Sequence, residues 1–339
     1  MIITFKSIPR HLLLLILIIS CGKLTNKEED SAKKLTLETE LLNSVSNTSN
    51  NYNKRLIENL VFKGGGVLGI AYAGAIKALY EEGMLQNIKR TAGTSAGSIV
   101  AALVAFNYSS DEILELISGT NFINFEKDEN PIRIATKYGL YDGLSALVWI
   151  ESFISKKTNN PKITFAEMEA QGYKQLRVFA TDLTDSKIQE FSSRTTPNTI
   201  VSESIRASMS IPLFFDVWKF SNSNPNDHFY VDGGLTYNYP ISTFSSENTL
   251  GFYLYHEANE TEKKLSEDDL PMYIVKLFKT AVKAQEFDFM KNKKERDVSV
   301  LINDFGISPI KFDLHDKDKK KLFISGFEST KSYLETINK

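Results

Sequence analysis

A serine flanked by two glycines is the residue of this sequence best placed for nucleophilic chemistry. The segment Gly93-Thr94-Ser95-Ala96-Gly97 matches G-x-S-x-G, in which a serine lies on a tight turn between a strand and a helix. Glycine is needed on both sides because side chains there would collide with neighbouring backbone. The turn exposes the serine Oγ at a helix N-terminus, where the helix dipole favours developing negative charge. We therefore predict that Ser95 is a nucleophile.

A serine becomes a good nucleophile only when a base takes its proton. Asp232, in the segment YVDGGLTYNYPI, ends an apolar strand pattern and precedes two glycines that allow another backbone to approach closely. A carboxyl group partly buried there would have its pKa raised towards that of a working base. A triad in the order Ser95, Asp232, His256 is an alternative, because His256 follows a strand pattern at the expected end. The direct dyad is favoured because the polar residues around His256 do not suggest a catalytic loop.

The segment LVFKGGGVLGIAYAG, residues 60–74, contains a glycine-rich loop that could bind an anion. Gly64, Gly66 and Gly69 satisfy G-x-G-x-x-G between a strand pattern and a helix pattern, which is the dinucleotide-binding fingerprint. The same backbone N–H groups could instead bind the oxyanion of an acyl-transfer reaction. A dinucleotide site needs an acidic residue about 20 residues further on, and the Ser95 segment occupies that position. A dinucleotide-binding enzyme is therefore the weaker alternative.

Strand and helix patterns alternate along the chain and must position these residues. This alternation predicts an α/β fold with a parallel sheet and crossover helices. Strands are predicted at 59–63, 88–93, 174–183, 228–234 and 248–255, and helices at 69–84 and 96–107. A loop or cap is expected at 121–142, and a closing helix near Asp316.

Residues 269–297 carry a long amphipathic helical pattern. Its apolar residues Ile274, Leu277, Phe278, Ala281 and Val282 are expected to share one face. Such a face usually belongs to the core, so we predict that it is buried. Contact with a membrane is the alternative, because basic amphipathic helices also lie on lipid.

With FKGGGVLG, GTSAG and VDGG in this order, the chain resembles the patatin-like phospholipases. The blocks YGLYDGLSALVWIESFI, ITFAEME, LRVFATDLTD and SIRASMSIPLFF extend the resemblance over residues 60–240. The resemblance implies a three-layer α/β/α fold with a mostly parallel central sheet in residues 55–339. It also implies a Ser–Asp dyad that hydrolyses acyl esters of phospholipids or lysophospholipids without a metal ion or other cofactor.

The resemblance also implies roles for individual residues. Ser95 is expected to form an acyl-enzyme, and Asp232 to deprotonate Ser95 and later the attacking water. The expected oxyanion hole consists of backbone N–H groups of Gly64, Gly65, Gly66 and Ala96. The remaining motif glycines are Gly69, Gly93, Gly97, Gly233 and Gly234. Gly69 is expected to let the following helix pack close to the strand. Many family members carry a basic residue where this chain has Leu68, which weakens a role for charge in binding lipid phosphate there.

The N-terminal residues are predicted to be a targeting segment. MIITFKSIPRHLLLLILIISCGK has a basic start and an apolar run much shorter than the ~20 residues of a membrane span, as in a secretory signal peptide. Cys21, the single cysteine, follows aliphatic residues and a serine, as in a bacterial lipobox. We predict a lipoprotein signal peptide at 1–20, lipidation of Cys21 and a polar tether at 21–54. An ordinary signal peptide is the alternative. The expected location is the bacterial cell envelope, at an outer membrane where one exists.

Composition and charge narrow the possible partners. The formal net charge of −2 gives no field that would attract nucleic acid. The Asp and His residues near Asp316 match no metal-binding loop, so no metal is predicted. A catalytically silent envelope lipoprotein that binds lipid is the non-enzymatic alternative. The presence of both dyad residues and all the motif glycines argues against it.

Overall fold

Seven strands form one mostly parallel sheet in the computed structural model, which describes residues 56–220, 228–256 and 270–337. The strand order is β5 (Lys187–Phe191), β4 (Gln175–Asp182), β2 (Arg90–Thr94), β1 (Asn59–Phe62), β8 (Thr249–Tyr255) and β9 (Ser299–Asn303). β7 (Tyr230–Asp232) also pairs with β4, and both β5 and β7 run antiparallel to it. All other neighbours in the sheet are parallel. The carboxyl ends of β1, β2 and β4 therefore lie at one end of the sheet.

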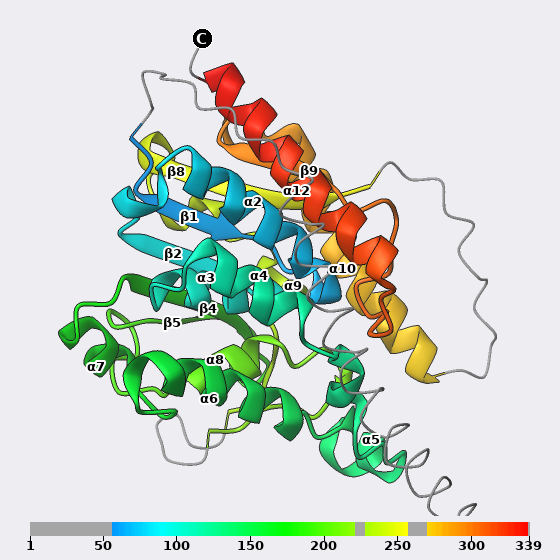
Figure 1. Ribbon diagram of the computed structural model, residues 1–339. Coiled ribbons are helices and arrows are strands. Elements are labelled where there is room, and N and C mark those ends of the chain that lie inside the picture. Colours follow the sequence, from blue (N-terminus) through cyan, green and yellow to red (C-terminus); the bar gives the residue numbers. More distant parts are fainter. Residues whose placement is uncertain (1–55, 221–227, 257–269, 338–339) are drawn as a thin grey trace, which may run out of the picture. The chain divides into compact units, whose positions relative to one another are not determined.

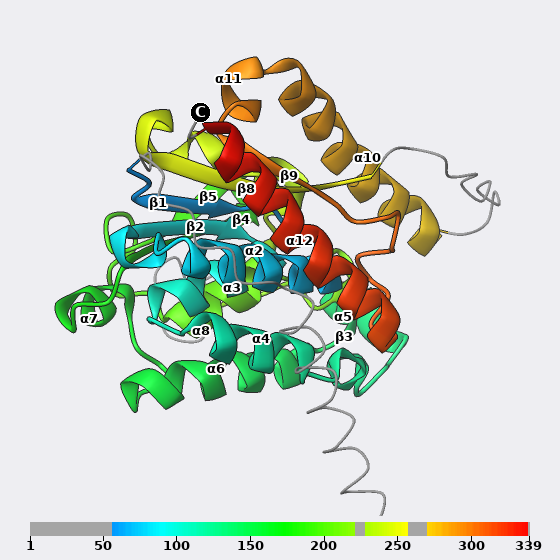
Figure 2. The ribbon, with the colours of Figure 1, turned by 45° about the horizontal axis from the view of Figure 1, so that its top comes forward.

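Helices cover both faces of this sheet, because side chains of a buried strand alternate between the two faces. The Phe62 ring packs edge-on against Tyr72 of α2 (Ile70–Glu81) on one face. Val61 belongs to an apolar cluster on the other face with Phe289 of α10 (Leu270–Lys291). Figures 1 and 2 show α2, α3 (Ala96–Ala105) and α12 (Asp316–Ile337) on one face and α10 on the other, where α9 (Gly234–Tyr237) contacts α10. The predicted three-layer α/β/α fold is confirmed.

The closing helix α12 packs along α2 through two glycines. A Cβ on Gly74 would lie 2.0 Å from the carbonyl oxygen of Phe323, and one on Gly326 would lie 1.8 Å from the carbonyl oxygen of Ala71. The two helices therefore approach backbone to backbone, which only glycine allows. This contact fixes the helix that follows the glycine loop. The other helices are α4 (Ser110–Ser118), α5 (Ile132–Lys137), α6 (Leu144–Thr158), α7 (Phe165–Ala170), α8 (Val201–Ser208) and α11 (Lys293–Arg296).

The segment predicted as a loop or cap, 121–142, contains regular structure. It forms a 3₁₀ helix at Phe122–Glu126, α5 and the short strand β3 (Gly139–Tyr141). β3 pairs in parallel with β6 (Leu213–Phe215), which makes a second, two-stranded sheet. The pairing joins residues far apart in the sequence, so local patterns did not indicate it.

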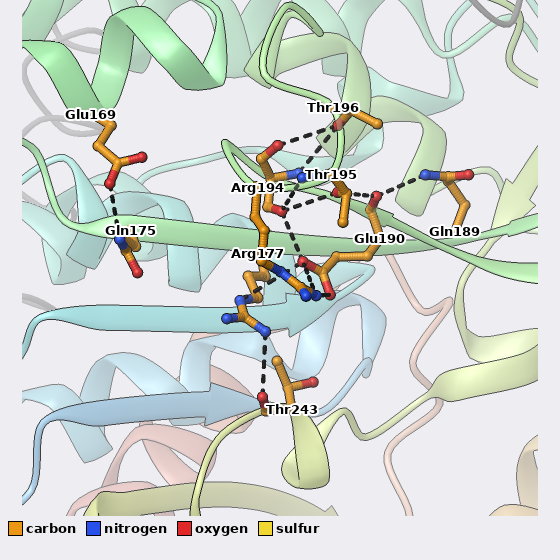
Figure 3. Close-up of polar contacts among 10 residues, drawn as sticks. Glu169, Gln175, Arg177, Gln189, Glu190, Arg194, Thr195, Thr196 and Thr243 are labelled. Carbon is orange, nitrogen blue, oxygen red and sulfur yellow. Dashed lines mark hydrogen bonds and ion pairs between the residues drawn. The ribbon is translucent and has the colours of Figure 1, made fainter.

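A polar network holds the β5 edge of the main sheet (Figure 3). Arg194 donates to both carboxylate oxygens of Glu190, at 3.3 and 3.1 Å, and Arg177 of β4 donates to the carbonyl oxygen of Thr243 at 3.3 Å. The Nε atom of Arg177 also lies 3.8 Å from Glu190 Oε1. Charged groups on an edge strand oppose pairing with another chain. The network therefore protects the open edge of the sheet.

Several predictions about the N-terminus fall on parts of the chain that the structure does not describe. The signal peptide at 1–20, Cys21 and the tether at 21–54 lie outside the described residues. Within the described ranges, no helix combines the length and the apolar character that a membrane span requires. All described residues belong to one compact unit that comprises residues 47–339.

Candidate active site

Ser95 lies on the turn from β2 to α3, with φ 52° and ψ −127°. This positive φ is unfavourable for a residue that carries a side chain, so the surrounding structure must hold it. Close backbone contacts define the turn. A Cβ on Gly93 would lie 2.2 Å from the carbonyl oxygen of Gly97, and one on Gly97 would lie 2.3 Å from that of Phe62. Both flanking glycines are therefore required for this turn.

The carboxyl ends of β2 and β7 face each other along β4, and this arrangement brings Ser95 and Asp232 together. β2 runs parallel to β4 and pairs with it up to Thr94, which lies opposite Phe179. β7 approaches antiparallel and ends with Asp232 opposite Ala180, the next residue of β4. Because Ser95 follows Thr94 directly, the strand register places the serine beside the aspartate.

The two side chains are joined by a short hydrogen bond. Ser95 Oγ donates to Asp232 Oδ2 at 2.6 Å, and Asp232 Oδ1 accepts the N–H of Gly234 at 2.7 Å. Asp232 is 2% exposed. Burial raises the pKa of Asp232 to about 7, although both hydrogen bonds act in the opposite direction. A carboxyl group with this pKa can accept and return a proton near neutral pH.

His256 does not reach this pair. Its Nδ1 lies 3.3 Å from Asp304 Oδ1, in the segment that follows β9. The two carboxylate oxygens of Asp232 are already bonded to Ser95 and Gly234. The alternative triad in the order Ser95, Asp232, His256 is therefore wrong.

The glycine loop lies beside the serine, but its first N–H group is not directed at the site. Gly64 donates its N–H to the carbonyl oxygen of Asn238 at 2.9 Å. The prediction that Gly64 contributes to an oxyanion hole is therefore corrected. Within the described part of the chain, the N–H groups of Gly65, Gly66 and Ala96 have no hydrogen-bond partner. Ala96 is the first residue of α3, whose initial N–H groups have no partner within the helix. These three groups can bind an anion.

The shape of the loop depends on Gly66 and much less on Gly69. Gly66 has φ +54°, and a Cβ there would lie 2.0 Å from the carbonyl oxygen of Pro309. That oxygen accepts the N–H of Val67 at 2.9 Å, which anchors the loop. A Cβ on Gly69 would make only an ordinary contact of 3.8 Å with Ala96. The expected role of Gly69 in close helix packing is therefore wrong.

Three residues not identified from the sequence hold the dyad in place. Ser208 Oγ accepts the N–H of Ser95 at 2.8 Å and donates to the carbonyl oxygen of Phe179 at 2.5 Å. The carbonyl oxygen of Ser210 accepts the N–H of Asp232 at 2.8 Å. Thr181 Oγ1 donates to the carbonyl oxygen of Asp232 at 3.0 Å. Ser208 and Ser210 belong to the block SIRASMSIPLFF, and the resemblance of this block to the family is the only feature of the sequence that indicates a role for them.

Arg206 connects this block to the segment that precedes α6. Its guanidinium donates to the carbonyl oxygens of Gly143 at 3.1 Å and Asp142 at 2.8 Å, and to Ser210 Oγ at 2.7 Å. The side chain is fully buried. Burial lowers its pKa to about 10, although Asp216 and Asp142 oppose this change. Arg206 therefore remains charged and fixes the backbone that supports Asp232.

Helix α10 is bonded to the short helix that follows Asp232. Gln285 Nε2 donates to the carbonyl oxygens of Gly234 at 2.9 Å and Leu235 at 3.2 Å. Its Oε1 accepts the N–H of Asn238 at 2.7 Å. Asn238 in turn accepts from Gly64, so one glutamine supports both the aspartate turn and the glycine loop.

Lys63, immediately before the glycine loop, lies in a cavity of about 240 Å³ between α9, α10 and β8. Its Nζ donates to the carbonyl oxygen of Leu254 at 3.0 Å and to Glu286 at 2.7 Å. Neither Ser95 nor Asp232 lines this cavity. The paired lysine therefore anchors the end of β1 and is not directed at the dyad.

One group among the described residues could present three metal ligands: Asp182, Asp185 and His228. His228 Nδ1 lies 2.6 Å from Asp182 Oδ2. Lys187 Nζ lies 2.5 Å from Asp185 and 3.8 Å from Asp182, so a cationic side chain already balances these carboxylates. We therefore interpret these three residues and Lys187 as an ion-pair cluster at the start of β5.

Comparisons with known proteins identify the family of this chain. The family model described as "Patatin-like phospholipase" matches residues 60–245. An uncharacterized protein of Acanthamoeba polyphaga mimivirus is 31% identical over 289 residues, which cover 82% of this chain and 94% of that protein. "Probable lipid hydrolase 463L" of Invertebrate iridescent virus 6 is 29% identical over 186 residues, 54% of this chain and 62% of the viral protein.

A solved structure shares the fold at low sequence identity. VipD from Legionella pneumophila superposes with a TM-score of 0.57 at 16% identity, over 87% of this chain and 72% of that chain. The family match includes Ser95, Asp232 and the glycine loop. The chain therefore belongs to the patatin-like phospholipase family of lipid hydrolases.

Proposed function

We propose that the protein hydrolyses acyl esters of phospholipids or lysophospholipids with Ser95 as the nucleophile and Asp232 as the general base. The observation that carries this proposal is the 2.6 Å hydrogen bond from Ser95 Oγ to a buried carboxyl group whose pKa is about 7. The family and the name of the iridescent virus relative support a lipid substrate.

In the first step, Asp232 takes the proton of Ser95 as Oγ attacks the ester carbonyl carbon. The carbonyl oxygen becomes an oxyanion, which the N–H groups of Gly65, Gly66 and Ala96 would bind. When the C–O bond breaks, the proton passes from Asp232 to the departing alcohol and the acyl group stays on Ser95. Removing one such donor typically lowers kcat on the order of 10²–10³-fold.

In the second step, a water molecule attacks the acyl-enzyme while Asp232 takes one of its protons. Collapse of the second oxyanion releases the fatty acid and returns the proton to Ser95 Oγ. One carboxyl group thus serves as base and acid in both halves of the reaction, for which a pKa near the working pH is best suited.

The test is release of fatty acid from phosphatidylcholine and phosphatidylglycerol vesicles by the purified full chain in the presence of a metal chelator. Mass spectrometry of the products identifies which ester bond is broken. We expect hydrolysis by the wild type and by His256→Ala, and none by Ser95→Ala. If the wild type releases no fatty acid from any of these lipids, the proposed hydrolysis is refuted and the alternative of a catalytically silent lipid-binding protein is favoured.

We also propose that Cys21 carries a lipid that anchors the enzyme in the bacterial cell envelope. The lipobox-like residues before Cys21 and the polar segment after it support this proposal. Labelling of cells with a fatty-acid probe should mark the wild-type protein and should not mark Cys21→Ser. Equal labelling of both would exclude this anchor.

A further inference from the structure

The outer face of α10 carries an apolar stripe that no other described element covers. Tyr273, Leu277 and Phe287 are 50%, 51% and 65% exposed. At 100° per residue these three side chains lie within about 80° of one another around the helix axis. The sequence pattern had placed Leu277 on the inner face with Phe278, and the structure corrects this. The inner face carries Phe278, Gln285 and Phe289.

Lysines border one side of this stripe, and the exposed Asp288 lies next to its other side. Lys276, Lys279 and Lys283 follow one of its borders at a spacing of three or four residues. Lys279 and Lys283 have no acidic partner among the residues that the structure describes. Lys291 Nζ lies 4.2 Å above the ring of the exposed Phe287. An apolar stripe bordered by lysines is typical of a helix that lies in the surface of an anionic bilayer.

The inner face of the same helix touches the catalytic turn. Gln285 is bonded to Gly234 and Leu235, the second and third residues after Asp232. A Cβ on Gly234 would lie 3.3 Å from the Phe278 ring. One helix therefore presents lysines and apolar side chains outwards while it contacts the site inwards.

A second group of exposed apolar residues lies near the same end of the molecule. Ile132, Tyr138, Leu144 and Val148 are all exposed, on α5, before β3 and on α6. Figures 1 and 2 both show α5 and the first turns of α10 at one end of the molecule. α10 also contacts β6, which pairs with β3. The apolar residues of the two segments can therefore meet one lipid surface.

We propose that the outer face of α10, formed by Tyr273, Leu277, Phe287 and the flanking lysines, docks the enzyme on an anionic phospholipid bilayer. The inference deepens the proposed function, on which it rests: it makes the substrate a lipid within a membrane rather than a dispersed ester. The apolar side chains enter the headgroup boundary, and the lysines face the lipid phosphates. A docked α10 holds the Asp232 turn close to the lipid.

The chain offers a direct test because Cys21 is its only cysteine. In a Cys21→Ser background, Leu277→Cys is labelled with a fluorophore whose emission shifts to the blue in an apolar environment. The matched control is Tyr80→Cys, because Tyr80 is 54% exposed on the last turn of α2. Both full-length proteins also carry Ser95→Ala, so the lipids stay intact. They are titrated with vesicles of equal parts phosphatidylglycerol and phosphatidylcholine, and with phosphatidylcholine alone.

We expect a blue shift at position 277 on phosphatidylglycerol-containing vesicles, and none at position 80. The double substitution Lys279→Glu with Lys283→Glu is then introduced into the labelled protein. It should raise the lipid concentration that gives half of the blue shift at least tenfold, because each lysine near an anionic surface increases the affinity for the membrane about fivefold. No shift at position 277, an equal shift at position 80, or an unchanged titration after the lysine substitutions would overturn the docking surface. Vesicle hydrolysis by the unlabelled wild type without a shift at 277 refutes only the docking. A shift without hydrolysis refutes only the proposed function.

Discussion

Replacing Asp232 with asparagine should abolish hydrolysis and, at the same time, stabilise the fold. Burial raises the pKa of Asp232 from 3.8 to about 7. Because the folded pKa lies above the unfolded one, the folded protein holds this proton more tightly, and ionising the group lowers the free energy of unfolding. The contribution of Asp232 to stability therefore falls as the pH rises from about 4 to about 7, and it stays low above that range.

The size of this effect follows from the two pKa values. Their difference corresponds to about 4 kcal/mol at about 1.4 kcal/mol per pKa unit. Asparagine keeps the shape and both hydrogen bonds, since its Oδ1 can accept from Gly234 and its Nδ2 can donate to Ser95 Oγ. We expect Asp232→Asn to exceed the wild type by about 4 kcal/mol at pH 8 and by less than about 1 kcal/mol at pH 4.

Urea unfolding at the two pH values, followed by tryptophan fluorescence, measures this difference. Asp288→Asn is the matched control for removal of one carboxylate, because Asp288 is an exposed aspartate on α10. The reasoning is refuted if Asp232→Asn is no more stable than the wild type at pH 8. It is also refuted if the gain is the same at both pH values, because the gain would then have no link to ionisation.

Three further predictions concern the rest of the site. The wild-type kcat/KM should fall about tenfold per pH unit below about 7 and be level above it, since Asp232 must be ionised to act as the base; a flat profile between pH 5 and 8 would contradict this. Ser208→Ala leaves the buried N–H of Ser95 without its acceptor, so kcat should drop about tenfold with KM little changed, whereas wild-type kcat would show that Ser208 does not position the nucleophile. Gly66→Ala places a Cβ against the carbonyl oxygen of Pro309 at a positive φ and should lower both activity and the unfolding midpoint; a wild-type melting curve with full activity would exclude the loop geometry described above.

Local patterns sufficed to predict the elements that carry the chemistry. G-x-S-x-G can occupy its turn only with glycines at both flanks, so Ser95 could be placed between β2 and α3 from the sequence. The buried strands β1, β4 and β8 are apolar runs bounded by polar residues and were predicted nearly to the residue. The fold class follows because such strands alternate with helices.

Non-local contacts could not be predicted in the same way. The antiparallel approach of β7, which places Asp232 opposite Ala180, depends on a pairing between distant segments. The hydrogen bond from Gly64 to Asn238 removes one expected oxyanion donor, and nothing near Gly64 in the sequence indicates it. The outward orientation of Leu277 depends on which side of α10 meets α9, because the helix is apolar on two sides.

The dyad itself is tested most directly by a double-mutant comparison of phospholipid hydrolysis. The rates of Ser95→Ala, Asp232→Asn and the double variant are measured against the wild type on the same phosphatidylglycerol vesicles. When two residues act as one unit, removing either of them abolishes the contribution of both to catalysis. Each single variant should therefore lower kcat on the order of 10³–10⁴-fold, and the double variant should lower it little further. Losses that multiply in the double variant, or wild-type hydrolysis by Asp232→Asn, would contradict a Ser95–Asp232 dyad.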